Sequence, residues 1–506
     1  MRRVVTLLVV GTCLLGAHAG HPHAPPEARL MKSPIASSPE HVAAGKVLYE
    51  KHCAECHGAD GKAHTPLAGK LQARPTDLSS FMMESRRDGE IYWVITHGIG
   101  HEVKGYRTFW SMPPFADKVP ELGRWELVQY VRDLRAKQRA TEKARLGPYE
   151  WDLPAGLPFP NVPADNPMTA EKVELGRHLF YDRRLSLTQT QSCATCHQQK
   201  LAFTDGKARG VGCTGETHPR GPMSLVNVAY SPVLTWANPN MRRLEDQALV
   251  PLFGEDPVEL GMSGKEDMLA QRLKSVRAYR KMFAASFPGD RDPFTVRNLV
   301  RAIASFERTI LSGDSPYDRY QSGDDPQAIS AAAKRGESLF FSERLECFHC
   351  HGGFNFTGTI DYLDKGFAEV EFHNTGLYNL KARFSYPQPN LGLYLFTHRE
   401  EDVGKFKAPT LRNIAVTAPY MHDGSVGTLE AAIDHYSSGG RAIQDGAYAG
   451  DGAANPHKSQ FVKAFALNSE ERADLLAFLR SLTDERVLTD AKLSDPWHAR
   501  RRRGTS

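Results

Sequence analysis

The sequence lacks any apolar run after its first 20 residues that is long enough to cross a membrane. No later stretch approaches the roughly 18 apolar residues that a spanning helix needs, which excludes a transmembrane segment in the mature chain. An excess of one charge is also lacking, because 63 basic and 59 acidic residues leave a formal net charge of +4. We therefore expect no nucleic-acid partner, and we interpret the basic run 500–503 as part of a solvated tail over 491–506.

Cysteine is scarce, and its distribution excludes a structural disulfide within one chain. Six of the eight cysteines lie in three copies of one short pattern, at 53–57, 193–197 and 347–351. Cys13 falls in the N-terminal apolar run, so only Cys213 is left over and has no partner to pair with.

Each copy has two cysteines separated by two residues and followed by a histidine, which is the attachment pattern of haem c. The copies are Cys53-Ala-Glu-Cys56-His57, Cys193-Ala-Thr-Cys196-His197 and Cys347-Phe-His-Cys350-His351. The thiols bond to the haem vinyl groups and the histidine binds the iron. Zinc is the alternative, but each pair would need two further ligands at finger or ribbon spacing, and the pairs lie far apart in the chain. The sequence therefore predicts three covalently bound haem c groups.

The N-terminus has the features of an export signal in the usual order. Arg2 and Arg3 precede an apolar run over 4–15, and the small residues of 17–19 provide a cleavage site. We predict a signal peptide over 1–19, cleavage near Ala19 and a periplasmic product. A lipid anchor on Cys13 is the weaker alternative, because the threonine before it is a poor residue in a lipoprotein site.

Strand-like alternation is scarce, whereas apolar residues recur at helical spacing. Helices are predicted over 42–52 and 125–134, from about residue 169, over 296–310 with Thr295 as N-cap, over 330–341, and over 475–482 after a capping box of Asn468 and Glu471. We expect an all-α (mainly α) fold of cytochrome c-like domains. The predicted order is a disordered leader (20–40), a mono-haem cytochrome c domain (41–140), a proline-rich linker (141–167), a peroxidatic haem domain (168–325) and an electron-transfer haem domain (326–490).

Residues 41–140 resemble a small class I cytochrome c. CHGADG contains the first attachment histidine, and Trp110-Ser111-Met112-Pro113 follows some 55 residues later in what we expect to be an irregular loop. The resemblance implies His57 and Met112 as the two iron ligands, although a methionine there is also suited to filling the core. An iron with both axial positions filled binds no substrate, so this domain is expected only to transfer electrons.

Residues 164–490 resemble the di-haem bacterial cytochrome c peroxidases and their relatives MauG and MbnH. The matching stretches are LGRHLFYDRRLS, SCATCH, LEDQALVPLFGEDPVELG, AIASFERTIL, CFHCHGG, FKAPTLRN and PYMHDGS. The resemblance implies that one haem keeps an open site for hydrogen peroxide, while the other stores and relays charge.

By this resemblance, Glu259 is the acid/base of the peroxide site and Gln247 an orienting hydrogen-bond group, with Pro251 shaping the wall. A carboxyl and an amide are useful there because one peroxide oxygen must lose a proton and the other must gain one. Without the resemblance, both are ordinary polar loop residues. The resemblance also implies that Trp236 relays electrons between two haems, although a packed core tryptophan is the common alternative.

The second ligand of the His351 iron distinguishes members of the family. The resemblance places Tyr436 there, as in MauG, where other peroxidases have methionine. A phenolate stabilises higher oxidation states of iron, whereas a thioether stabilises the ferrous state. His435 is a rival ligand, but we expect it to point to another face of its helix.

The segment 212–218 has no histidine at the place where peroxidases keep a removable ligand, which favours a permanently open iron. Cys213 is a candidate ligand, an oxidisable thiol or an inert buried one, and His218 also stays a candidate ligand. The family's calcium site is expected at Thr417 and Pro419, although Gly221 replaces the asparagine of that site and removes one oxygen ligand.

We therefore predict an exported tri-haem oxidoreductase that uses hydrogen peroxide at the His197 haem and exchanges electrons with a redox partner protein. Two alternatives stay open. One is peroxide-dependent oxidation of a protein side chain, such as tryptophan, on a partner, and the other is a non-catalytic multi-haem electron conduit.

Overall fold

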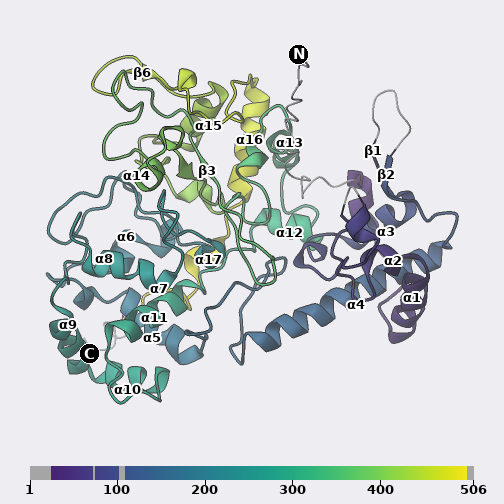
Figure 1. Ribbon diagram of the computed structural model, residues 1–506, viewed down its shortest axis with the longest axis horizontal. Helices are drawn as coiled ribbons and strands as arrows, with labels where there is room; N and C mark the ends of the chain where they lie inside the picture. Colours follow the sequence, from purple (N-terminus) through teal and green to yellow (C-terminus); the bar gives the residue numbers. More distant parts are fainter. Residues whose placement is uncertain (1–23, 72–73, 102–108, 498–506) are drawn as a thin grey trace, which may run out of the picture.

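The computed structural model describes residues 24–71, 74–101 and 109–497, and these residues are mainly helical (Figure 1). Strands within the described ranges form two-stranded antiparallel ribbons. They pair β1 (Ile99–His101) with β2 (Phe109–Met112), β3 (Phe372–His373) with β4 (Phe406–Lys407), and β5 (Ala442–Ile443) with β6 (Gly450–Asp451). No described helix is both long and apolar enough to span a membrane. The predicted all-α class is confirmed, while the predicted signal peptide 1–19 and the run 500–503 lie outside the described residues.

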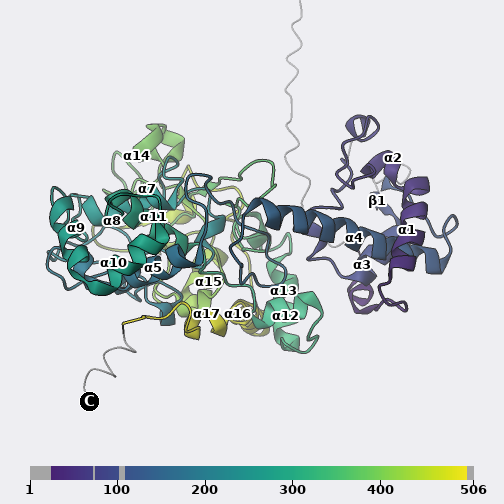
Figure 2. The ribbon, with the colours of Figure 1, turned by 90° about the horizontal axis from the view of Figure 1, so that it is seen from below.

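The N-terminal unit forms a lobe of its own, on the right of Figures 1 and 2. Its helices are η1 (Pro26–Leu30), α1 (Pro39–His52), α2 (Ala54–His57), η2 (Ala68–Lys70), η3 (Phe81–Met83), α3 (Asp88–His97) and α4 (Glu121–Arg145). Tyr92 stacks on Trp125 in its core, with ring centroids 4.1 Å apart. The long helix α4 runs from this core back toward the rest of the molecule (Figure 2).

Two predicted boundaries of this unit were wrong. The expected disordered leader is ordered from residue 24 onward, because Ala28 is buried and its carbonyl oxygen packs against Gly89 at the start of α3. The linker does not begin at residue 141, because α4 continues to Arg145. An ion pair of Arg135 with Glu142, both buried, stabilises this last part of the helix.

The second unit surrounds the middle haem pattern. Its helices are α5 (Ala170–Phe180), η4 (Arg183–Leu185), α6 (Cys193–Cys196), η5 (Gln199–Leu201), η6 (Val228–Tyr230), α7 (Leu244–Gln247), α8 (Leu249–Phe253), α9 (Glu266–Ser275), α10 (Arg277–Ser286) and α11 (Val296–Glu307). Thr169 and Thr295 cap α5 and α11 as N-cap residues, as their side chains accept hydrogen bonds from Lys172 and Asn298.

The third unit surrounds the last haem pattern. Its helices are α12 (Pro316–Ser322), α13 (Ala331–Phe340), η7 (Cys347–His349), α14 (Tyr394–Thr397), η8 (Glu400–Asp402), η9 (Ile414–Val416), α15 (Leu429–Ser437), η10 (Gly452–Ala454), α16 (Ser469–Ser481) and α17 (Glu485–Thr489). The capping box of Asn468 and Glu471 is confirmed at the start of α16. The structure moves α12 into this unit, ahead of the expected boundary at 325, because Tyr317 packs on Phe478 of α16.

The expected tail over 491–506 is also shorter than predicted, because its first residues pack on the second unit. Leu493 is buried, and the Trp497 indole donates a hydrogen bond to the carbonyl oxygen of His178 on α5.

The same crossing of two helices occurs in all three units. The helix before each haem pattern carries a glycine at the crossing, and an added Cβ there would lie within 2.0 Å of a carbonyl oxygen of the second helix. The pairs are Gly45 with Glu126, Gly176 with Ala302, and Gly336 with Asp474. An aromatic residue one helical turn further on lies beside each glycine, namely Tyr130, Phe306 and Phe478. The chain therefore contains three versions of one helix pair, and in each the first helix precedes a haem pattern.

Candidate functional site

The three attachment histidines are held in the same way. The Nδ1 atoms of His57, His197 and His351 lie 2.9, 2.9 and 3.1 Å from the backbone oxygens of Thr76, Phe203 and Phe356. A carbonyl oxygen only accepts, so each Nδ1 carries the proton and each Nε2 keeps its lone pair. This is the arrangement of an iron-binding histidine with a hydrogen-bonded outer nitrogen. The cysteines beside them form no disulfide within the described residues. The chain is therefore suited to hold haem c at each pattern.

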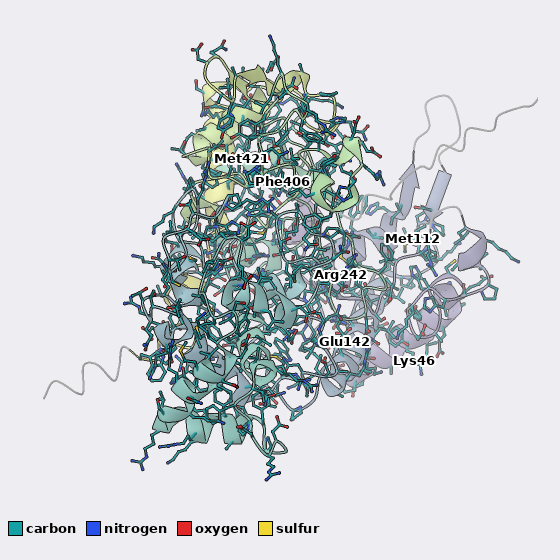
Figure 3. All side chains as sticks on the ribbon, turned by 60° about the vertical axis from the view of Figure 1, so that its left-hand side comes forward. Lys46, Met112, Glu142, Arg242, Phe406 and Met421 are labelled. Carbon is teal, nitrogen blue, oxygen red and sulfur yellow. The ribbon has the colours of Figure 1, made fainter. Side chains whose placement is uncertain are left out.

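Met112 lies in the lobe of the first pattern (Figure 3). It is half-buried, packs against the core that contains Tyr49, and pairs with Ile99 as the last residue of β2. The prediction of an irregular loop is therefore wrong at this position, since the strand ends at Met112 and the loop begins with Pro113. The methionine remains our predicted second ligand opposite His57.

Tyr436 faces the third pattern. Burial raises the pKa of its hydroxyl, and the nearby thiols of Cys350 and Cys347 raise it further. Its neighbour His435 is buried on another side of α15, where burial lowers its pKa to about 4 and the charge of Arg441 acts in the same direction. Tyr436 and His435 thus point to different sides of the helix, as expected, and this favours Tyr436 as the ligand opposite His351.

Glu259 faces the second pattern. Burial raises the pKa of its carboxyl. Burial also raises the pKa values of the Cys193 and Cys196 thiols, and the charge of Glu259 contributes to both shifts, so the carboxyl lies close to the attachment cysteines. The backbone of Leu260 donates a hydrogen bond to Pro251, 2.9 Å long, which ties the Glu259 loop to α8. The structure therefore places the Glu259 carboxyl near the attachment cysteines, where a polar residue of a solvated loop would not lie.

Gln247 ends α7, directly before α8, and is half-buried. Glu245, two residues before Gln247, is buried and pairs with Arg308 at 2.9 Å. Asn166 also donates to its Oε1. Glu245 therefore anchors α7 against α11 and leaves Gln247 at the end of a rigid turn.

Trp236 lies between the second and third units. Its Nε1 donates to the carbonyl oxygen of Gly221 in the second unit, at 2.9 Å, and its own carbonyl oxygen accepts from the backbone of Lys407 on β4, at 2.8 Å. The indole packs against the core of the third unit. A tryptophan fixed from both sides in this way is well placed for the relay role that the sequence suggested.

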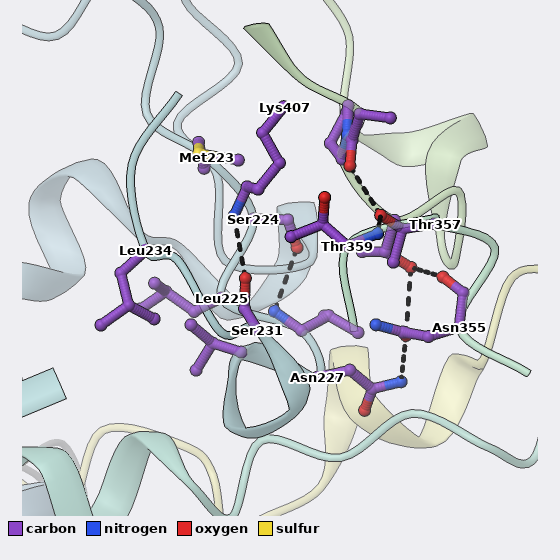
Figure 4. Close-up of a pocket in the computed structure, with 15 residues that line it drawn as sticks. Met223, Ser224, Leu225, Asn227, Ser231, Leu234, Asn355, Thr357, Thr359 and Lys407 are labelled. Carbon is purple, nitrogen blue, oxygen red and sulfur yellow. Dashed lines mark hydrogen bonds between the residues drawn. The ribbon is translucent and has the colours of Figure 1, made fainter. Parts of the chain in front are cut away.

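A cavity of about 60 Å³, which the sequence did not predict, is lined by residues of the second and third units (Figure 4). Lys407 is buried at its edge and donates to Ser231 Oγ at 2.9 Å and to the carbonyl oxygen of Val233 at 2.7 Å. Burial lowers its pKa to about 7. The volume is enough for a few water molecules between the two haem units.

The expected calcium site is only partly assembled. The Gly221 backbone donates to His422, three residues after Pro419, so the two segments meet. Thr417 Oγ1, however, donates to its own neighbour Ile414, and the Gly221 carbonyl oxygen is already used by Trp236. The one cluster of three potential metal ligands in the described ranges is Glu343, Glu346 and His349, elsewhere in the unit. Calcium at Thr417 and Pro419 would therefore depend on backbone oxygens and stays a proposal.

Sequence reasoning missed two further buried ionisable groups. Lys407 stands in FKAPTLRN and Glu307 in AIASFERTIL, both stretches that we had singled out. Burial raises the pKa of the Glu307 carboxyl to about 8, and its Oε2 has no hydrogen-bond partner among the described residues. For Glu307 the available indication was a charged residue within the apolar periodic segment 296–310.

Comparisons with known proteins agree with this geometry. Residues 170–326 match the family model of di-haem cytochrome c peroxidase, and residues 40–131 match that of cytochrome c oxidase, cbb3-type, subunit III. The methylamine utilization protein MauG of Methylorubrum extorquens is 35% identical over 334 residues, which cover 66% of this chain and 83% of MauG. The chain belongs to the di-haem cytochrome c peroxidase and MauG family. It is accordingly an oxidoreductase that acts on peroxide through covalently bound haem c.

Other members support the assignment. Cytochrome-c peroxidase IdrP1 of a Pseudomonas species is 34% identical over 348 residues, covering 65% of this chain and 85% of that protein. Among solved structures, a MauG-like protein associated with microbial copper homeostasis is 47% identical, with a TM-score of 0.68, covering 69% of this chain and 100% of its own. The family relationship thus lies in the two haem units after the N-terminal lobe.

Proposed function

We propose that this protein is an exported tri-haem peroxidase that reduces hydrogen peroxide at the His197 haem with electrons passed on by the other two haems. The observation that carries the proposal is the carboxyl of Glu259 beside Cys193 and Cys196, with a pKa raised by burial. Met112 and Tyr436 are suited to close the irons of the first and third patterns. The middle iron is then the one with a free face and a proton-carrying group beside it.

Reduction of one hydrogen peroxide to two water molecules consumes two electrons and two protons. The haem supplies the redox centre at which these electrons reach the peroxide oxygens. Glu259 accepts the proton of one peroxide oxygen and returns it to the other, which leaves as water. Its raised pKa lies nearer neutrality, which favours proton exchange in both directions. Gln247, at the end of its anchored turn, orients the peroxide by hydrogen bonding.

The electron supply is proposed from the contact between the N-terminal lobe and the third unit. Phe81 is buried and meets Phe354 and Tyr362 edge to face, with centroid distances of 5.2 and 5.7 Å. Phe81 follows Thr76, which holds His57, by five residues, and Phe354 follows His351 by three. This contact therefore links the surroundings of two iron-binding histidines, and we propose that electrons pass from the His57 haem to the His351 haem across it.

Polar contacts at the same interface support a docked lobe rather than a tethered one. Arg145 pairs with Asp364 of the third unit at 2.6 Å, and Gln138 donates to the same carboxylate at 3.1 Å. Arg87 donates to the carbonyl oxygens of Tyr320 and Gln321 on α12. The described contacts of the lobe thus reach the third unit, and Trp236 then offers the step from there to the peroxide site.

Spectroscopy and turnover together test the proposal. In the ferric protein as isolated, electron paramagnetic resonance is expected to give one high-spin and two low-spin irons. Hydrogen peroxide is expected to be consumed steadily only when a reduced donor is present. Three low-spin irons that persist in every redox state would instead identify an electron conduit. The mature N-terminus of protein recovered from the periplasm tests export.

A second candidate function is peroxide-dependent oxidation of a side chain, such as tryptophan, on a partner protein. Tyr436 at the third pattern favours it, because a phenolate ligand stabilises highly oxidised iron. The 47% identity to a MauG-like structure points in the same direction. A long-lived oxidised state, formed by peroxide in the ferric protein without any donor, supports this function, whereas turnover that requires the donor supports peroxide removal.

A further inference from the structure

Two loops of the second unit are joined into one rigid element around Glu259. The backbone of Cys213 donates to the Glu259 carbonyl oxygen at 2.7 Å, and the backbone of Val258 donates to Glu216 Oε2 at 2.8 Å. A Cβ at Gly212 would lie 1.8 Å from the Val258 carbonyl oxygen, so only glycine permits this approach. The position of the Glu259 side chain is therefore coupled to the loop over 210–218.

His218 is the residue of that loop which faces the carboxyl. Its backbone donates to Gly210 at 2.8 Å, which fixes its place, and its Nε2 lies 3.9 Å from Glu259 Oε1. About a third of each side chain is accessible to solvent. The distance is one that a small rotation of the carboxyl or one bridging water closes.

The ring has a defined tautomer. The backbone N–H of Arg220 donates to His218 Nδ1 at 3.2 Å, so Nδ1 accepts and the neutral ring carries its proton on Nε2. Burial lowers the pKa of His218, and the charge of Arg220 lowers it further. Arg220 and Glu259 are the charged groups that face the ring among the described residues. A neutral ring thus directs an N–H at the carboxyl of Glu259.

We propose that His218 is a positioning residue for Glu259, to which its Nε2–H donates a hydrogen bond directly or through one water. The bond holds the carboxyl in one orientation and stabilises its ionised form. This inference rests on the proposed role of Glu259 in peroxide reduction. The loop over 210–218 would then serve to orient Glu259 rather than to supply a removable iron ligand.

The test compares three variants of the holoprotein. His218→Leu removes the donor, and His218→Gln keeps an amide N–H near the Nε2 position. Thr214→Ala is the matched control, because Thr214 is exposed on the same loop and directed at Glu216. Two quantities are measured: the second-order rate constant for peroxide, and the pH titration of the ferric haem absorption without peroxide.

In His218→Leu, the rate constant is expected to fall about 10- to 100-fold, the size of one hydrogen bond to a charged group. The pH at which Glu259 titrates is expected to rise, because its ionised form loses a donor. His218→Gln and Thr214→Ala are expected to stay close to the parent protein in both measurements.

Three results would overturn the proposal. The first is an unchanged rate constant and titration in His218→Leu. The second is an equal fall of the rate constant in His218→Gln and His218→Leu. It would mean that the reaction requires protonation and deprotonation of the imidazole ring rather than donation of a hydrogen bond. The third is conversion of a low-spin to a high-spin iron in His218→Leu, which identifies an iron ligand. If the parent protein does not react with peroxide, the proposed function fails, but the titration without peroxide still tests the pair.

Discussion

Phe81 of the N-terminal lobe meets Phe354 of the third unit edge to face, with ring centroids 5.2 Å apart. Phe354 in turn meets Tyr230 of the second unit at 5.1 Å. One ring therefore contacts aromatic residues of both other units while lying three residues from the attachment histidine His351. This places the junction of all three units next to the third haem pattern.

Phe81→Leu keeps the apolar character of this contact but removes the ring. Loss of an aromatic pair costs about 1 kcal/mol, so the docked arrangement of the lobe becomes less populated. Electron transfer between the His57 and His351 haems is therefore expected to slow by up to about tenfold. Flash reduction followed by absorption at the haem bands measures the rate. Phe367→Leu, at an exposed position of the third unit, is the control. Equal rates in the two variants would exclude this contact as the route.

Glu259→Gln removes the proton-exchanging group without changing its size. The rate constant for peroxide is expected to fall by about 10²–10⁴-fold, the usual contribution of general acid–base catalysis. In the parent protein the rate rises with pH through the raised pKa of Glu259, because only the ionised carboxyl accepts a proton, and this dependence is expected to vanish in the variant. Stopped-flow kinetics over a range of pH measures both effects.

The control for this experiment is Glu255→Gln, which changes an exposed carboxyl of the same loop that bonds to Ser263. It is expected to keep the parent rate and pH profile. A Glu259→Gln protein with the parent rate constant would mean that another group exchanges the protons.

The haem attachment patterns were recognisable in the sequence because they are short and local, whereas the role of Glu259 stays a prediction from the family resemblance. The spacing of Cys193, Cys196 and His197 is a covalent requirement of haem c, and Glu259 stands in a stretch of recognisable order. The sequence did not reveal what the side chains of His218 and Lys407 contact. What each side chain faces depends on the approach of a loop or strand from a distant part of the chain, namely the Glu259 loop and the segment around Ser231.

The helix positions were predictable for a similar reason, and the boundaries of the units were not. Thr295 and Asn468 are local capping signals, and both were confirmed. The continuation of α4 to Arg145 depends on the buried pair of Arg135 and Glu142, which looks like an exposed helical pair in sequence. The place of α12 depends on the contact of Tyr317 with Phe478, which are 161 positions apart in the numbering.

Tyr436→Met replaces the predicted phenolate ligand by a thioether. The reduction potential of the His351 haem is expected to rise by on the order of 0.1 V, a part of the range of about 0.8 V that axial ligands cover. Spectroelectrochemical titration measures it. His435→Gln is the control, since His435 lies on another side of the helix, and it is expected to leave the potential unchanged. A shift in the control instead of in Tyr436→Met would make His435 the ligand.

Glu307 makes folding stability depend on pH. Burial raises the pKa of its carboxyl from the ordinary value of 4.5 to about 8 in the folded chain, so folding favours its protonated form. Its contribution is fully present below about pH 4.5 and is lost as the pH rises through 8. Glu307→Gln has no carboxyl to ionise, so it does not lose stability in this way. The difference in free energy of unfolding between the variant and the parent is expected to grow in favour of the variant between pH 5 and pH 8, to on the order of a few kcal/mol. Urea unfolding at both pH values measures it, and an advantage independent of pH would contradict the burial of an uncharged carboxyl.

Gly176→Ala tests the helix crossing on which each haem unit is built. Alanine is the better helix former by about 1 kcal/mol, but its Cβ would lie 1.9 Å from the Ala302 carbonyl oxygen on α11, so the helices must separate. Overpacking of this kind costs about 1–3 kcal/mol, and the clash with backbone outweighs the gain in propensity. The midpoint of urea unfolding of the second unit is expected to fall. Gly289→Ala is the matched control, since an added Cβ there meets nothing within 4 Å, and it is expected to leave the midpoint unchanged or slightly raised. A stabilised Gly176→Ala protein would show that the crossing tolerates a wider separation than the three glycines imply.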